Sequence, residues 1–310
     1  MIRFRHYSAE SEAEWNAFVA ASRNGTFLHD RRYMDYHSDR FTDGSLLVEH
    51  DEQVVALLPA NRTEDALVSH GGLTYGGFLV NERMTAPLML AVFQDVAPHL
   101  RGLGYGRLIY KAIPHIYHRS PAEEDLYALF RLGARLTRRD VLSVVDQTQR
   151  LPLQDRRRRG ARKAADRGHV VAESDDWRGF WRLLAGRLDE KYQTRPVHSA
   201  EEMELLGARF PKSIRLFVCR QADEIMAGVA IYDTGQVVHA QYIAASEEGR
   251  KGGAQDLLFL HLIDLFSDRR WFDFGVSNED QGRYLNEGLV QYKEGFGART
   301  VAHDFYELSL

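Results

Sequence analysis

Four side chains between residues 236 and 298 have types that suit proton transfer and charge stabilisation. His239 is a candidate general base, because the pKa of histidine lies near neutral pH. Tyr242 is a candidate proton donor. Asp273 lies in an otherwise apolar run, where a carboxylate must be paired or functional. Lys293 lies next to residues predicted to be buried, and a partly buried lysine can hold an oxyanion or a phosphate.

Each of these four residues also has an ordinary structural interpretation. His239 and Tyr242 can be packed in a core, and Asp273 can pair with an arginine. Lys293 can be a surface lysine whose aliphatic chain covers apolar neighbours. The sequence leaves both interpretations open for all four residues.

A glycine-rich segment lies close to these residues. Residues 247–253 are predicted to form a loop between a strand at 236–244 and a helix that begins at Ala254. A turn of this kind presents unpaired N–H groups that suit a phosphate or pyrophosphate, although it can also be a plain turn. The residues predicted to bind such a group are Arg250, Lys251, Gly252, Gly253 and Ala254. Asn278, just after a strand at 271–276, is a further candidate, or it caps the next helix.

The second half of the chain is predicted to position these groups on a sheet. Helices are expected at 177–192 and at 200–209, where Ser199 and Glu202 have the spacing of a capping box. The strands expected to form an antiparallel meander and a buried partner are 214–219, 225–232, 236–244 and 271–276. Strand alternation places His239 and Gln241 on one face and Ala240 and Tyr242 on the other.

The first half has a similar order of elements, which indicates an internal repeat. Gly133-Ala134-Arg135 followed by Asp140 recurs as Gly297-Ala298-Arg299 followed by Asp304, with the same spacing. A helix at 27–37, strands at 45–49, 54–60 and 66–69 and a glycine-rich polar stretch at 70–77 are expected before it. The polar stretch 147–154 suggests a first domain at 1–150 and a second at 151–310.

Composition limits the classes of protein that the chain can belong to. It has 310 residues, a net charge of −4, one cysteine and no long apolar run, so we expect a cytoplasmic protein without a membrane span. The net charge argues against a general nucleic-acid binder. Cys219 is expected in a buried strand, and no zinc-binding spacing or P-loop is present, so no metal is predicted.

Two further groups of residues are candidates for substrate binding. The basic run 156–163, with Arg167, can grip phosphates of an acceptor or of tRNA, or can be a solvated helix face. Loop residues that could line a cleft between the two domains are Tyr75, Gly76, Tyr192, Arg195 and His198.

Helices, a meander, a glycine-bearing loop, a helix and a closing strand follow the order of the GNAT acyltransferase fold. Two such units in one chain resemble the FemABX family and the FemAB-like acetyltransferases. The segments that carry the resemblance are Phe27-Leu28-His29-Asp30 with Tyr33, the Gly133-Ala134-Arg135 turn, the strand 271–276, and Tyr292-Lys293-Glu294-Gly295-Phe296-Gly297. The resemblance implies an α/β (α+β) protein with two GNAT-like domains, each with a mixed, mainly antiparallel sheet flanked by helices.

The resemblance also implies an activity. Acyl-CoA, as acetyl-CoA or a longer acyl-CoA, would bind domain two at the glycine segment, where Gln255 departs from the small residue usual in GNAT enzymes. The acceptor would be a small-molecule or nucleotide-linked amine, such as an amino sugar or cell-envelope precursor. His37 stands where FemABX proteins often carry a phosphate-binding lysine. Lys293 would hold the oxyanion, His239 would be the base, and Tyr242 would protonate the departing thiolate.

Two alternatives remain open at this stage. One is an aminoacyl-tRNA-dependent transferase on the same fold, against which the net acidic charge argues. The other is a GNAT-fold binding module without catalysis, which the imperfect glycine segment favours.

Overall fold

The computed structural model describes residues 1–310, apart from the side chains of Lys191 and Tyr192. The chain forms two compact units. Unit 1 consists of Met1–Asp140, Asp280–Arg283 and Ala302–Leu310, and unit 2 consists of Val141–Glu279 and Tyr284–Val301. The C-terminal end thus belongs to unit 1, whereas the sequence grouped it with the second half. The assignment of the halves to acceptor and acyl donor stays a prediction.

Unit 2 is built on a sheet whose strands have the order β8-β13-β12-β11-β10-β9. These strands are β8 (Arg135–Asp146, paired with β13 from Leu142 on), β9 (Val170–Ser174), β10 (Ile214–Gln221), β11 (Glu224–Asp233), β12 (Val237–Ala245) and β13 (Trp271–Val276). All neighbours are antiparallel except β12 and β13, which are parallel. The meander and the buried strand predicted from the sequence are confirmed.

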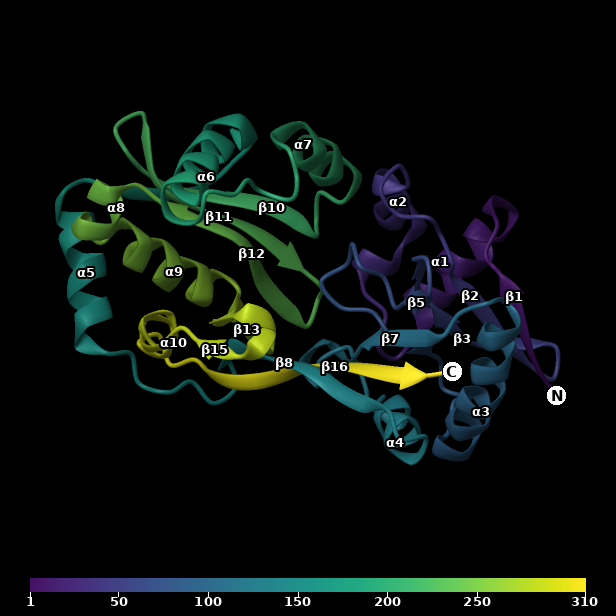
Figure 1. The fold of residues 1–310 in the computed structure, drawn as a ribbon. Coiled ribbons are helices and arrows are strands. Elements are labelled where there is room, and N and C mark those ends of the chain that lie inside the picture. Colours follow the sequence, from purple (N-terminus) through teal and green to yellow (C-terminus); the bar gives the residue numbers. More distant parts are fainter. The chain divides into compact units, whose positions relative to one another are not determined.

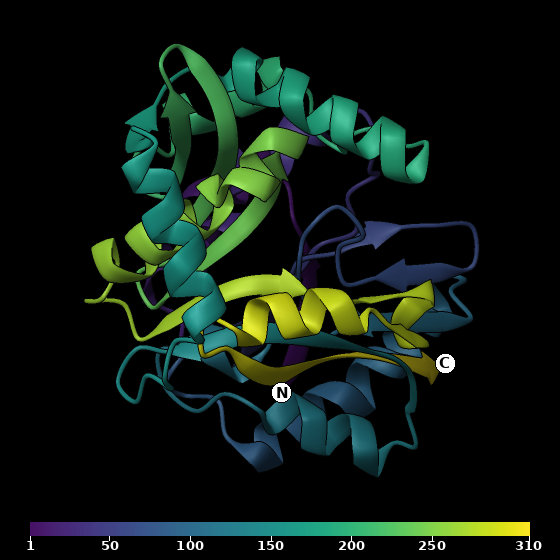
Figure 2. The ribbon, with the colours of Figure 1, turned by 90° about the vertical axis from the view of Figure 1, so that its left-hand side faces the viewer.

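Helices cover both faces of this sheet (Figure 1). They are α5 (Asp155–Asp166), α6 (Trp177–Tyr192), α7 (Ala200–Arg209), α8 (Glu247–Gly252), α9 (Ala254–Leu265) and α10 (Glu287–Glu294). Helix α6 packs on β11 and β12, α9 packs on β10 and β11, and α5 runs beside α9 (Figure 2). A small hairpin of β14 (Asn278–Glu279) and β15 (Tyr284–Leu285) precedes α10.

The two faces of the sheet are distinguished by alternate residues of β11. Val229 and Ile231 belong to the apolar core beneath α9, together with Phe259 of that helix. Gly228 faces the other way, because a Cβ built on it would lie 2.5 Å from the Phe180 ring of α6. Cys219 is fully buried in the α9-side core, as expected.

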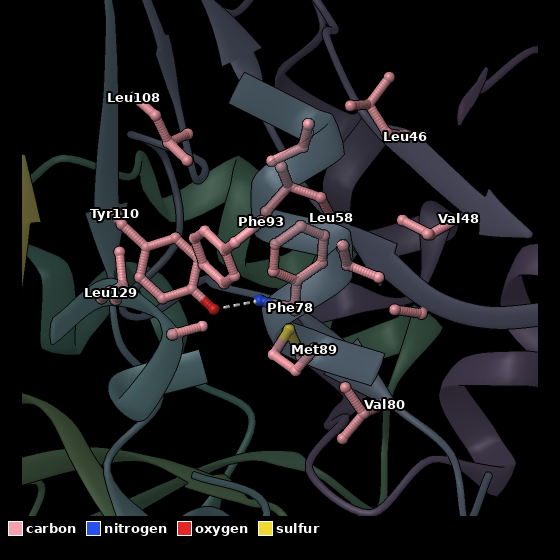
Figure 3. Close-up of a cluster of buried hydrophobic side chains, with 14 of the residues drawn as sticks. Leu46, Val48, Leu58, Phe78, Val80, Met89, Phe93, Leu108, Tyr110 and Leu129 are labelled. Carbon is pink, nitrogen blue, oxygen red and sulfur yellow. Dashed lines mark hydrogen bonds between the residues drawn. The ribbon is translucent and has the colours of Figure 1, made fainter. Parts of the chain in front are cut away.

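The strands of unit 1 belong to two sheets, one of which has the order β1-β2-β3-β6. Its elements are β1 (Ile2–His6), α1 (Glu12–Ala21), α2 (Arg31–Met34), β2 (Leu46–His50), β3 (Gln53–Leu58), β4 (Asn61–Arg62), β5 (Ala66–Val68), β6 (Leu79–Val80), α3 (Ala86–Gly102), β7 (Arg107–Lys111), α4 (Glu124–Arg131) and the end of β16 (Arg299–Ser309). In its core the Tyr110 hydroxyl accepts a hydrogen bond from the Phe78 N–H at 2.7 Å (Figure 3). The hydroxyl in turn donates to the buried Asp125 carboxylate at 2.5 Å.

Two sequence expectations for unit 1 need correction. The helix expected at 27–37 is only the four-residue α2, with 3-10 turns at Phe27–His29 and Asp35–His37. The third strand of the expected meander, β5, pairs with β4 and β7 instead of β3, and β6 takes its place beside β3. No helix among the described residues is long and apolar enough to cross a membrane.

The predicted repeat is visible in the structure. Strand β13 begins at Trp271, 164 residues after β7 begins at Arg107, and β16 begins at Arg299, again 164 residues after β8 begins at Arg135. Gly133 and Gly297 both have positive φ, +72° and +90°, and both end the turn between a helix and a long strand. Glycine is favoured there because it adopts positive φ at little steric cost.

Helices α8 and α9 are separated by a kink that requires glycine. Gly253 has φ +89°, and a Cβ at this position would lie 2.0 Å from the Gly160 carbonyl oxygen of α5. We therefore expect Gly253→Ala to lower the free energy of unfolding by at least about 2 kcal/mol, because backbone must shift. Gly102→Ala is the matched control, since no atom lies within 4 Å of its Cβ. Urea unfolding of both variants tests this, and equal midpoints would contradict it.

Candidate functional site

The site begins where the two parallel strands of unit 2 separate. Strands β12 and β13 pair through Val237–Trp271, Val238–Phe272 and His239–Asp273. Within the described residues this pairing ends there, although β12 continues to Ala245. Both strands are irregular at this level, because Gln241 is an extra residue opposite β11 and β13 has a register shift between Asp273 and Val276. Two bulges at one level leave backbone N–H groups outside the ladder.

The bulge at Gln241 changes which side chains share a face. Ala240 pairs with Ile231, which faces α9. Tyr242 pairs with the preceding residue of β11, Ala230, which faces the opposite side of the sheet. Tyr242 therefore faces α6, and its ring packs edge-on against Trp181 at 5.1 Å. His239 also faces this side, because Val238 belongs to the α9-side core. The prediction that His239 and Tyr242 lie on opposite faces is wrong, since the extra residue resets the alternation.

His239 forms a buried pair with Asp273. The His239 Nδ1–H donates to the Asp273 carboxylate at 2.8 Å, and the second carboxylate oxygen accepts from the Gly275 N–H at 2.7 Å. Asp273 is fully buried and His239 is 9% exposed. Because a carboxylate only accepts hydrogen bonds, it fixes the proton on Nδ1 and leaves Nε2 as the basic atom. The expected arginine partner of Asp273 is thus a histidine.

Lys293 of α10 is buried at 3% exposure, so the surface interpretation is wrong. Its ammonium group donates to the Gly275 carbonyl at 2.9 Å, to the Val276 carbonyl at 2.8 Å and to the Ser277 hydroxyl at 2.9 Å. These three acceptors use all three protons of the group. Burial lowers the pKa of Lys293 to about 8, and the Asp273 charge opposes this shift only in part.

Tyr242 is connected to the segment between α6 and α7. Its hydroxyl forms a short hydrogen bond with His198 Nδ1, and the His198 carbonyl accepts from the Trp181 indole N–H at 2.8 Å. Burial raises the pKa of Tyr242 to about 12. The phenol therefore keeps its proton at neutral pH and can donate it.

A cavity of about 650 Å³ lies between α6 and α7. His198 and Arg195, both predicted to bind substrate, line it together with Trp181, Asp189 and Glu202. Its size is that of a small-molecule site. It is linked to Tyr242 through the His198 hydrogen bond. The side chain of Tyr192, the third predicted residue of this segment, lies outside the described residues.

The glycine segment is not the loop that the sequence predicted. Residues Glu247–Gly252 form α8, capped by Ser246, and α9 follows directly after Gly253. Arg250 and Lys251 are exposed, whereas Gly252, Gly253 and Ala254 are buried. The first turn of α9 carries Asp256, whose carboxylate pairs with the buried Arg157 of α5 at 2.5 Å. A role for these residues in holding pyrophosphate stays a prediction.

The remaining predicted residues lie elsewhere. In unit 1, Tyr75 is buried and hydrogen-bonded to Thr26 at 3.1 Å, and Gly76 packs against the Ser69 backbone. His37, also in unit 1, is buried and stacks on His70 with ring centroids 5.2 Å apart. In unit 2, the Asn278 side chain accepts from the Val141 N–H at 2.6 Å. Three of these residues thus have packing or hydrogen-bonding roles in unit 1, and Asn278 ties β14 to β8.

Sequence reasoning did not predict the contacts that support the pair and the lysine. Gly275 stands where a Cβ would be 3.2 Å from the His239 ring, and Ser277 is hydrogen-bonded to Ser143 at 2.8 Å. A glycine inside a predicted strand often marks a bulge or a close approach, and that signal was available at Gly275. Among the described side chains no group of three or more histidine, cysteine or acidic residues could hold a metal ion.

Residues 154–294 match the family of the acetyltransferase (GNAT) domain. This segment contains all four candidate residues of unit 2 and the cavity. This segment therefore matches a GNAT acetyltransferase domain, and the prediction of an acyltransferase is confirmed. A comparison of the sequence with curated proteins finds no match.

Several solved structures share the fold of the whole chain. A crystal structure of FemX has a TM-score of 0.67 at 12% identity and covers 99% of this chain and 97% of its own. The C-terminal domain of a protein assigned as a lysylphosphatidylglycerol synthetase from Agrobacterium fabrum has a TM-score of 0.66 at 14% identity, covering 97% and 92%. A tandem GNAT protein from the clavulanic acid biosynthesis pathway has 0.55 at 11%, covering 100% and 98%. At such identities the fold is shared, so the predicted α/β architecture of two GNAT-like domains is confirmed.

Proposed function

We propose that this protein is an N-acyltransferase that moves an acyl group from acyl-CoA to an amine, on the face of β12 that α6 and α7 cover. The observation that carries this proposal is the His239–Asp273 pair at the point where β12 and β13 separate. Tyr242 lies on the same face of β12. The β11 residues opposite His239 and Tyr242 are Tyr232 and Ala230, which are two positions apart, or about 7 Å along a strand. A base and an acid at this spacing suit acyl transfer.

The residues divide the reaction between them. His239 Nε2 takes the proton of the attacking amine, while Asp273 holds the ring through Nδ1. The amine nitrogen bonds to the acyl carbon, and N–H groups at the β12 bulge stabilise the negative charge on the carbonyl oxygen. The carbon–sulfur bond then breaks, and Tyr242 protonates the departing thiolate. The product is an amide and free CoA.

Lys293 has a positioning role in this scheme. Two of its hydrogen bonds hold the carbonyls of Gly275 and Val276, just after the last pair that β13 forms with β12. The same segment carries the Gly275 N–H that fixes Asp273. To hold an oxyanion directly, as the sequence suggested, the ammonium would have to release one of these acceptors.

The class of amine acceptor is proposed from the solved structures of similar fold. FemX and a domain of a protein assigned as a lysylphosphatidylglycerol synthetase share the fold of the chain. We therefore propose an amine from a cell-envelope precursor, with a FemAB-like relationship. A mass-spectrometric screen of amines with acetyl-CoA and longer acyl-CoAs tests the reaction, and calorimetric titration tests donor binding. Binding without transfer to any amine would favour a non-catalytic module.

An aminoacyl-tRNA donor is the second candidate. It is favoured by the exposed basic face of α5, where Arg156, Arg159 and Arg162 point to solvent. A tRNA bound there should dissociate as salt rises, because phosphate contacts release counterions. A gel shift that depends on salt and is lost after charge reversal of these arginines would support this donor. If aminoacyl-tRNA is the donor, we also expect that the protein does not bind acyl-CoA.

A further inference from the structure

The cavity between α6 and α7 has charges of opposite sign on its lining. Asp189 belongs to the last turn of α6, and Arg195 belongs to the segment that leads to α7. Both residues are exposed, and neither has an ion-pair partner among the side chains that the structure describes. Charges of opposite sign in one cavity suit a ligand that carries both signs.

The helix ends reinforce this polarity. The carbonyl end of α6, at Asp189, favours a cation, and the amino end of α7, which begins after Ser199, favours an anion. Glu202 also lines the cavity, but its carboxylate accepts from the Ser199 N–H at 2.7 Å as part of the cap. Asp189 is therefore the carboxylate left to meet a ligand cation, and Arg195 is the group left to meet an anion.

The floor of the cavity leads to the proposed chemistry. Trp181 and His198 are buried, and His198 is hydrogen-bonded to Tyr242. A ligand held between Asp189 and Arg195 would therefore lie one hydrogen-bonded residue away from the group that we assign as the acid. An indole wall also suits an ammonium group, since a cation is attracted to an aromatic ring.

We infer that the acceptor carries a zwitterionic segment, with an ammonium group and a carboxylate or a phosphate, and that this segment binds in the cavity. Its ammonium group lies toward Asp189 and its anionic group on Arg195, while a separate amine of the same molecule reacts at His239. The role of this ligand as acceptor rests on the proposed function, but its binding does not require acyl-CoA. It excludes simple apolar amines as preferred ligands.

Calorimetric titration without acyl-CoA tests the inference with a matched series. The ligands are 6-aminohexanoate, which has both charges, hexylamine, which has only the cation, and hexanoate, which has only the anion. Phosphoethanolamine replaces the carboxylate by a phosphate and distinguishes the two anions. We expect 6-aminohexanoate or phosphoethanolamine to bind about tenfold more tightly than either singly charged ligand, the gain of one favourable charge contact.

Variants assign each charge to its residue. Arg195→Gln should remove the advantage of the zwitterion over hexylamine, and Asp189→Asn should remove its advantage over hexanoate. Arg182→Gln and Glu190→Gln change exposed residues of α6 outside the cavity lining and should alter nothing. Equal affinities for all ligands, or variants without effect, would overturn the inference.

The result is separable from the proposed function. If the protein acylates hexylamine with acyl-CoA but does not prefer zwitterions, the function stands and this inference fails. If zwitterions bind as described and no acyl-CoA is consumed with any amine, the binding inference stands and the acyltransfer assignment of this site fails.

Discussion

Replacing His239 with alanine is expected to lower kcat by about 10²- to 10⁴-fold, the usual contribution of a positioned general base. The reason is that Nε2 of His239 is oriented by Asp273 at 2.8 Å on the face where the acyl group is proposed to react. Steady-state kinetics with acyl-CoA and an amine found in the screen measures the effect.

A matched pair of variants makes this result specific. His261→Ala alters an exposed histidine of α9 and should leave kcat unchanged. Asp273→Asn should lower kcat with less effect on KM, because an amide can no longer fix the proton on Nδ1 of His239. A His239→Ala enzyme that retains its rate would show that the histidine is a packed residue and that another group takes the proton.

The order of elements was accessible from the sequence because it depends on periodicity. Helix α6 occupies the predicted residues 177–192, and the capping box of Ser199 and Glu202 forms as expected. The glycines of the repeated Gly-Ala-Arg turns also have positive φ in both copies. Such features are local, since they depend on residues only a few positions apart.

The face of Tyr242 was not accessible in the same way. A single extra residue, Gln241, reverses the alternation of β12, and nothing in the local pattern distinguishes a bulged strand from a regular one. The acid and base candidates were therefore found as residue types but not as a pair. The partner of Asp273 was missed for a related reason, because it depends on the parallel register of β12 and β13.

The conformation of the glycine segment was not accessible from the sequence either. The sequence predicts a loop at 247–253, whereas these residues form α8 and the kink before α9, and Gly249 and Gly253 allow close approach to the Met226 and Gly160 carbonyls. Close packing and ligand binding demand the same residue, so glycine alone cannot distinguish them. The close packing here is against α5, a helix some ninety residues earlier in the chain that lies beside α9. No local pattern in the sequence could predict that contact.

Replacing Lys293 with methionine is expected to lower the free energy of unfolding by about 2 kcal/mol at pH 7. Methionine fills similar space but leaves the carbonyls of Gly275 and Val276 and the Ser277 hydroxyl without their donor. The loss should also reach catalysis, because the freed end of β13 carries the Gly275 N–H that holds Asp273. Urea unfolding and kcat, measured on the same preparation, test both effects.

The difference in free energy of unfolding between wild type and Lys293→Met should depend on pH with a defined sign. Burial lowers the pKa of Lys293 in the folded state to about 8, against the ordinary value of 10.5 in the unfolded chain. Between these values the unfolded state binds more protons, so the stability that Lys293 contributes rises with pH from about 8 upward. Below pH 8 the contribution is constant, because both states hold the proton. The gap between wild type and Lys293→Met should therefore widen by up to about 3 kcal/mol toward pH 10.5.

Comparing wild type with Lys293→Met isolates the contribution of Lys293 from those of the other titratable groups. Lys111 of β7 also has its pKa lowered to about 8 by burial, but it is present in both proteins and cancels in the difference. Lys212→Met, at an exposed lysine, should give a gap near zero at every pH. A wild-type advantage that stays level up to pH 10.5 and narrows above it would mean that the three acceptors outweigh burial. The ammonium form would then be the one that the fold prefers, and the positioning role of Lys293 would depend on its charge rather than on its hydrogen bonds alone.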